Sequence, residues 1–198
     1  MVRLLIGKRF LVARVSDETA GDGRLPIILA HGRAFGSGEH ETTRSCLEAL
    51  EELPLRPCGR VLDLGSGTGI LAVAAARLGA QHVIALDPSP EAIRTTLTTV
   101  RLNGVSGTVA PVQGEIGALR NTRFDLILAN LYGDVLLPIV SEIAALLAPG
   151  GYVVASGIQY ADAYDLKTGF ARAGCPLLKE RYLEEYSTLI FHSPAKPC

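Results

Sequence analysis

The chain has 198 residues, the length of one domain of ordinary size, and 48% of them are hydrophobic, enough to bury a substantial core. Its 19 basic and 20 acidic residues give a net charge of −1, so the charge balance makes nucleic acid or an acidic membrane surface an unlikely partner. The longest apolar run, residues 70–76, is too short to span a bilayer, and residues 1–10 lack the features of a signal peptide. We therefore expect a cytoplasmic protein with no membrane partner.

The four cysteines argue against a metal site. Cys46, Cys58, Cys175 and Cys198 are scattered, form no C-x-x-C pair and have no histidine at ligand spacing. We expect no bound metal and reduced thiols that are mostly packed in the interior.

The first part of the chain predicts a small β extension. Residues 3–6 and 10–15 flank a glycine turn and resemble a hairpin, and residues 25–30 predict a further short strand. These residues are too few for a core of their own. We therefore expect an extension with a glycine-rich loop over residues 1–38, attached to a main domain over residues 39–198, the whole forming one compact unit.

The main domain alternates between helices and strands. Helices are expected at 40–53, 70–78, 88–103, 135–147 and 162–173, and strands at 61–64, 82–86, 109–113, 124–129, 152–156, 175–182 and 186–191. Strands that are apolar throughout and alternate with helices predict an α/β fold, a doubly wound and mostly parallel seven-stranded sheet. The last two strands are expected to form an antiparallel hairpin.

The strongest motif lies where the first strand of the main domain meets a helix. Asp63, Gly65, Ser66, Gly67 and Gly69 belong to an apolar strand and a glycine turn that leads directly into a helix. Glycines allow close approach of a ligand to the backbone, and the helix N-terminus offers free N–H groups. A dinucleotide fingerprint would place its third glycine at position 70, where this chain has Ile70. The plain alternative is a tight turn without a ligand.

Two acids follow the next two strands. Asp87, followed by Pro88, ends a strand about twenty residues after the glycine turn, where a carboxylate can accept hydrogen bonds from ribose hydroxyls. The alternative is an Asp that caps the next helix. Glu115 follows the third strand of this domain, and taken by itself it is a solvated loop residue.

Asn130 and Tyr132 follow the fourth strand, where a substrate would meet the cofactor. The Asn130 carbonyl is suited to accept a hydrogen bond from an amine and to aim its lone pair. A structural turn residue is the alternative. Enzymes that modify the amino groups of nucleic-acid bases carry two prolines after such an Asn or Asp, which the chain lacks, so a flipped base is disfavoured.

The G-x-G-x-G spacing resembles motif I of class I methyltransferases, and residues 34–43, Ala-Phe-Gly-Ser-Gly-Glu-His-Glu-Thr-Thr, resemble the signature of the PrmA family of ribosomal protein methyltransferases. The resemblance continues at 63–72, 129–131 and 157–158. It implies a Rossmann-like fold, S-adenosyl-L-methionine as cofactor and methylation of amino groups on a ribosomal protein. For Glu115 it implies a contact to the adenine of the cofactor, as the alternative to a solvated loop residue. It also implies that six residues border the cofactor and the target amine: Phe35, Gly36, Ser37, Gly38, His40 and Thr43.

The chain departs from that family at several points. Ser37 replaces a usual Thr, and Glu39 and Glu41 replace a small or polar residue and a usual Pro. The family also carries an N-terminal domain that grips the ribosomal protein, for which we expect no room here. Methyl transfer to another protein or to a small-molecule amine therefore stays open, as do an NAD-dependent dehydrogenase and a cofactor-binding module without catalysis. Candidates for the base are Glu39, His40 and Tyr132. The sequence does not predict the oligomeric state.

Overall fold

The computed structural model describes residues 3–14, 23–30, 35–54, 59–119 and 121–195. Cys58 and Cys198 lie outside these ranges, as does most of the loop expected after the second strand.

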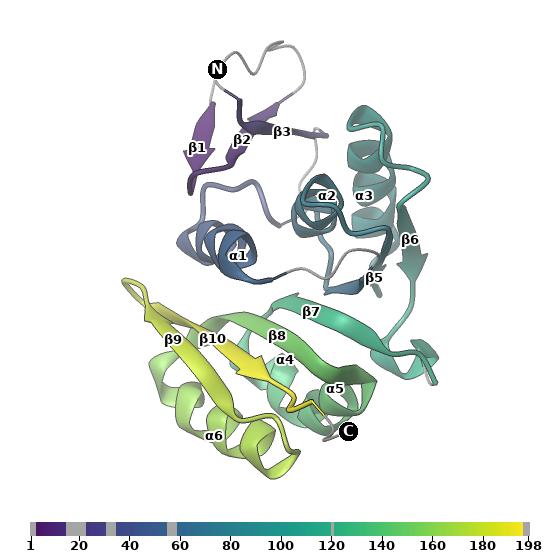
Figure 1. Ribbon diagram of the computed structural model, residues 1–198. Helices are drawn as coiled ribbons and strands as arrows, with labels where there is room; N and C mark the ends of the chain where they lie inside the picture. The colour runs from purple at the N-terminus through teal and green to yellow at the C-terminus, as the bar shows by residue number, and fades with distance from the viewer. Residues whose placement is uncertain (1–2, 15–22, 31–34, 55–58, 120, 196–198) are drawn as a thin grey trace.

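The N-terminal strands form a separate three-stranded sheet. β1 (Leu4–Ile6) and β2 (Phe10–Arg14) pair as the expected antiparallel hairpin, and β3 (Leu25–Leu29) runs parallel to β2. Phe10 and Ile27 are fully buried and belong to the hydrophobic cluster that also contains the buried apolar residues of the helices at 41–52 and 70–77. The extension thus packs into the same hydrophobic cluster as residues of these two helices, α1 and α2. In Figure 1 its three strands lie next to these helices.

The main sheet has the expected seven strands in the order β6-β5-β4-β7-β8-β10-β9. Its parallel strands are β4 (Arg60–Leu64), β5 (His82–Asp87), β6 (Val109–Gln113), β7 (Phe124–Asn130) and β8 (Leu147–Gln159). β9 (Leu177–Tyr182) and β10 (Tyr186–His192) form the expected antiparallel hairpin, and β10 inserts between β8 and β9. Because β10 is antiparallel, its first residue lies at the edge where the parallel strands end.

Helices cover both faces of this sheet (Figure 1). One face carries α1 (Glu41–Glu52), α2 (Ile70–Arg77) and α3 (Pro90–Leu102), and the other carries α4 (Gly133–Leu136), α5 (Val140–Leu146) and α6 (Tyr160–Arg172). Each face buries its own hydrophobic cluster. Fully apolar strands between two helical layers are the arrangement that their sequence predicts.

Two elements differ from the sequence prediction. The single helix expected at 135–147 is divided into α4, a 3-10 turn η2 (Leu137–Ile139) and α5. Pro138 explains the break, because proline has no N–H to continue the helical hydrogen bonds. Strand β8 begins earlier than expected, since Leu147 pairs with Phe124 before the register shifts past the Pro149-Gly150-Gly151 turn.

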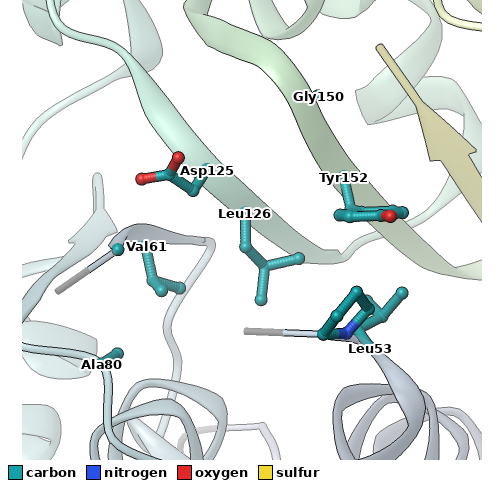
Figure 2. A pocket seen from close by; sticks show the side chains of 9 residues that line it. Leu53, Val61, Ala80, Asp125, Leu126, Gly150 and Tyr152 are labelled. Carbon is teal, nitrogen blue, oxygen red and sulfur yellow. The ribbon is translucent and has the colours of Figure 1, made fainter. Parts of the chain in front are cut away.

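The edge of the sheet where the parallel strands begin holds a small cavity of about 20 Å³ (Figure 2). Val61, Leu126 and Tyr152 line it from three adjacent strands. This volume is roughly that of a single water site. A much larger cavity, of about 530 Å³, lies at the opposite edge.

Candidate active site

A cavity of about 530 Å³ opens where β4, β5 and β7 end. This is the size of an ordinary small-molecule site, and the carboxyl edge of a doubly wound sheet is where such folds bind ligands. It is lined by Phe35, His40, Thr42, Gly65, Gly67, Asp87, Ser89, Glu91, Ala92, Asn130, Leu131, Tyr132, Val135, Gly157 and Tyr186.

The glycine turn after β4 is held against the N-terminal glycine loop. The Thr68 N–H donates to the carbonyl of Phe35 at 3.0 Å, and its hydroxyl donates to the carbonyl of Gly36 at 2.7 Å. Gly67 has φ +52°, and a Cβ there would collide with the Phe35 carbonyl oxygen. Glycine is therefore required at position 67 for the two loops to form one floor of the cavity.

A second set of bonds ties the same turn to α3. The Thr96 hydroxyl donates to the Gly67 carbonyl at 3.0 Å and lies 3.2 Å from the Ser66 hydroxyl. A Cβ on Gly69 would lie 2.8 Å from the Thr96 methyl group. Ser66 and Gly69 thus pack against Thr96 of α3 and do not line the cavity.

Asp87 closes the far end of the cavity. Its carboxylate accepts from the Gly67 N–H at 3.0 Å and from the Ser89 N–H at 2.9 Å, and only 9% of the residue is exposed. Ser89 caps α3 by accepting from the Ala92 N–H at 3.3 Å. Asp87 therefore orders both the glycine turn and the start of α3. Each carboxylate oxygen has a second lone pair for a ligand hydroxyl.

Asn130 ends β7 in the middle of the cavity. Its side-chain N–H donates to the hydroxyl of Thr43 at 3.1 Å, and Thr43 is fully buried in α1. This bond fixes the amide plane and leaves the carbonyl oxygen as the free acceptor. Thr43 lies behind Asn130 and does not line the cavity, so its place is that of a residue that positions Asn130.

His40 begins α1 at the other end of the cavity. Its Nδ1 accepts from the Thr42 N–H at 3.4 Å and lies 2.8 Å from the Thr42 hydroxyl, so the side chain caps the helix. A neutral imidazole has one acceptor nitrogen, and this bond occupies it. His40 would have to release the cap to serve as a base, which favours capping over base catalysis.

Asp63 lies under the glycine turn, not in the cavity. Only 1% of it is exposed, and its carboxylate accepts from the Ala72 N–H of α2 at 3.0 Å. Gly69, the N-cap of α2, has no side chain for this role, so Asp63 supplies the acceptor from the preceding strand. Burial raises the pKa of Asp63 to about 7, the Ala72 N–H opposes this rise, and the nearby Asp87 adds to it.

The structure gathers seven of the predicted site residues around one cavity: Phe35, His40, Gly65, Gly67, Asp87, Asn130 and Tyr132. The others lie outside its lining: Gly36, Ser37, Gly38, Thr43, Asp63, Ser66, Gly69, Pro88 and Glu115. Ser37 bonds to Glu39 at 3.2 Å, and Glu115 is an exposed residue just before the 3-10 turn η1 (Ile116–Leu119). The prediction that Glu115 contacts adenine has no support from this placement.

Sequence reasoning missed several residues of the site. Thr68 stood inside the glycine motif, but nothing local showed that its hydroxyl joins a second loop. Ser89 could have been found, because a serine before Pro90 is a typical helix cap. Tyr186 gave no signal, since it begins an antiparallel strand near the end of the sequence.

Metal and thiol chemistry find no support in the described residues. Among them, no group of three His, Cys, Asp or Glu side chains is arranged to hold a metal ion. Burial raises the pKa of the Cys46 thiol to about 12, so this thiol stays protonated and is a poor nucleophile. None of the helices in these residues is both long and apolar enough to cross a membrane.

The fold and the site together define a Rossmann-like protein with a small-molecule cavity at the carboxyl edge of its sheet. A putative SAM-dependent methyltransferase from Streptococcus mutans shares this fold with a TM-score of 0.66 and 16% identity, over 78% of this chain and 50% of that one. The [4+2]-cyclase SpnF is equally similar in fold, with a TM-score of 0.66 and 16% identity over 76% of this chain and 80% of that one. The fold alone therefore does not fix the reaction.

More specific similarity identifies the family. The chain belongs to the ribosomal protein L11 methyltransferase (PrmA) family, whose sequence pattern matches residues 4–192. A crystal structure of ribosomal protein L11 methylase from Lactobacillus delbrueckii subsp. bulgaricus superposes with a TM-score of 0.88 and 26% identity, covering 97% of this chain and 98% of that one.

Curated relatives carry the same description. Ribosomal protein L11 methyltransferase of Pelotomaculum thermopropionicum is 47% identical over 152 residues, which are 76% of this chain and 49% of that protein. The protein of Geobacter sulfurreducens is 40% identical over 189 residues, which are 95% of this chain and 62% of that protein. The chain thus spans between about half and three fifths of the length of these relatives.

Proposed function

We propose that this protein transfers a methyl group from S-adenosyl-L-methionine to an amino group of ribosomal protein L11, in the cytoplasm. Membership of the L11 methyltransferase family supports the reaction and the acceptor. The observation that carries the proposal is the placement of Asn130 in the cavity lining, at the end of the strand between β4 and β8, with its amide N–H bonded to Thr43.

The residues present fit this cofactor. Gly65 and Gly67 bring the backbone of the glycine turn into the cavity lining, and a Cβ at Gly65 would lie 2.5 Å from the Leu131 side chain, so the turn can pack there only with glycine. Asp87 is suited to accept hydrogen bonds from the ribose hydroxyls, and the first turn of α3 forms the adjoining wall. Bound S-adenosyl-L-methionine supplies an electrophilic methyl group on a positively charged sulfur.

Asn130 would orient the acceptor. Its carbonyl oxygen accepts a hydrogen bond from the amine and directs the nitrogen lone pair, while Thr43 holds the amide in place. Asn130, held by Thr43, would present that lone pair to the methyl group that the cofactor would supply. A lysine amine has an ordinary pKa of about 10.4, so it must lose one proton before it reacts. Positioning is the main contribution expected from the protein.

A different protein or a small-molecule amine remains a second candidate for the acceptor. The aromatic residues that line the cavity suit any amine whose chain can reach Asn130.

The first experiment is calorimetric titration with S-adenosylhomocysteine, with NAD as the matched control, followed by transfer of labelled methyl groups to purified L11. We expect binding of S-adenosylhomocysteine alone and labelling of L11. Binding of NAD instead would replace the methyltransferase proposal with a dehydrogenase, and cofactor binding without labelling of L11 would reject L11 as the acceptor.

A further inference from the structure

Three aromatic rings form a continuous wall at the acceptor end of the cavity. The ring centroids of Phe35 and His40 lie 5.5 Å apart at an interplanar angle of 61°, and those of His40 and Tyr186 lie 5.5 Å apart at 60°. The three residues come from the N-terminal loop, the start of α1 and the start of β10. All three line the cavity, and Phe35 is 53% exposed although it is a large apolar residue.

The charges around the cavity lie elsewhere. Its acidic lining residues are Asp87 and Glu91, and both belong to the end formed by β5 and the start of α3. Among the lining residues at the aromatic end there is no carboxylate that could pair with a cation. Aromatic faces attract cations through their quadrupoles, and such faces are the usual means of binding methylated ammonium groups.

Hydrogen bonds on both sides of the β9–β10 turn fix the position of Tyr186. The Glu41 carboxylate accepts from the Glu184 N–H at 2.8 Å and from the Glu185 N–H at 3.2 Å, and so holds the β9–β10 turn against the start of α1. On its other side the turn is tied by the Tyr160 hydroxyl, which donates to the Leu183 carbonyl. Tyr186 follows directly and pairs with Gln159 at the end of β8.

We propose that Phe35, His40 and Tyr186 bind the methylated ammonium group of the acceptor, with Tyr186 as a specificity-determining residue and Glu41 as its positioning residue. The inference rests on the proposed function, because it names what the acceptor end of that site recognises. An amine that has already been methylated is cationic and poorly solvated, and the aromatic wall retains it where a neutral aliphatic wall would not.

The test is a binding measurement in the presence of S-adenosylhomocysteine. An NMR titration compares Nα-acetyl-Nε-trimethyllysine methylamide with its neutral isostere, in which carbon replaces the charged nitrogen. We expect the protein to bind the cation about threefold to tenfold more tightly than the isostere. Tyr186→Leu should abolish this preference, and Tyr186→Phe should retain it.

A matched pair of variants tests the role of Glu41 in holding the β9–β10 turn, with Glu39 as the control position. Glu41→Ala should reduce the preference for the cation although Glu41 does not line the cavity, whereas Glu39→Ala, which removes an exposed neighbouring acid, should leave it unchanged. Every variant is first checked for unchanged affinity toward S-adenosylhomocysteine, which shows that the fold is intact.

Equal binding of the cation and the isostere by the unmodified protein would overturn the proposal, and so would an undiminished preference for the cation in Tyr186→Leu. A third contrary outcome is that Tyr186→Leu weakens only the binding of S-adenosyl-L-methionine, and not that of S-adenosylhomocysteine or of the trimethyllysine compound. The last would assign the wall to the cofactor's sulfonium. Failure of the protein to bind S-adenosylhomocysteine at all would instead refute the proposed function.

Discussion

The side-chain amide of Asn130 is oriented by one hydrogen bond. An amide has a donor end and an acceptor end, and Thr43 occupies the donor end. The carbonyl oxygen is then the acceptor that the amide can offer to a substrate. A buried threonine thus determines the chemistry that Asn130 can perform.

Removing the amide should affect transfer more than binding. We predict that Asn130→Ala leaves the affinity for S-adenosylhomocysteine near normal and lowers kcat roughly a hundredfold, because the amine loses its orientation. Thr43→Val, which deletes the hydroxyl at constant shape, should lower kcat about fivefold to tenfold, and Thr43→Ser should restore it. Collapse of cofactor binding in Asn130→Ala would place this residue in the cofactor pocket instead.

Asp87 should carry much of the cofactor affinity. We predict that Asp87→Ala weakens binding of S-adenosylhomocysteine about tenfold to a hundredfold, as expected when hydrogen bonds to a charged acceptor are lost. Glu115→Ala is the matched control, since this acid lies outside the cavity lining and its loss should leave the affinity unchanged. Calorimetry measures both, and an effect at Glu115 equal to that at Asp87 would contradict the placement described above.

At the scale of elements, the strand–turn–helix unit around Asp63 contains a buried acid that favours its neutral form. Its pKa of about 7 lies above the ordinary value of 3.8. Between these pH values the folded protein holds a proton that the unfolded chain releases. The stabilisation from this group is therefore fully present below about pH 3.8 and is lost as the pH rises through about 7.

Asp63→Asn isolates this contribution. The variant keeps an acceptor oxygen for the Ala72 N–H but does not ionise. We predict that its free energy of unfolding rises relative to the unmodified protein between pH 5 and pH 8. Denaturant titrations at several pH values measure the difference, in which the other titrating groups cancel. A pH-independent difference would show that Asp63 is ionised throughout this range.

Prediction from sequence succeeded where an element is decided by local pattern. Strand β4 and the glycine turn after it were recognisable because residues 60–70 contain both the apolar run and the three glycines that form them. It failed where partners are distant in the chain. The parallel pairing of β3 with β2 and the insertion of β10 beside β8 depend on packing, and no short segment encodes them. The roles of Thr68 and Tyr186 were missed for the same reason.

At the scale of the whole molecule, the N-terminal sheet and the main sheet share one core. Phe10 and Leu47 are fully buried members of the same cluster, although one belongs to β2 and the other to α1. Residues 1–38 and 39–198 are therefore successive segments of the sequence that contribute to one hydrophobic core.

We predict that Phe10→Ala destabilises the entire protein by about 3–5 kcal/mol and that unfolding remains a single transition. Phe170→Ala, on the opposite face of the main sheet, should have a similar cost and serves as the reference. Thermal unfolding followed by circular dichroism measures both. An early partial transition in Phe10→Ala alone would show that the N-terminal sheet unfolds separately.

The aromatic wall also sets an order of events during synthesis. Phe35 leaves the ribosome long before Tyr186, its neighbour across His40. Contacts between residues so distant in sequence form late in folding. The growing chain therefore has the glycine turn and Asp87 before it has the complete aromatic wall, which can form only after β10 has emerged.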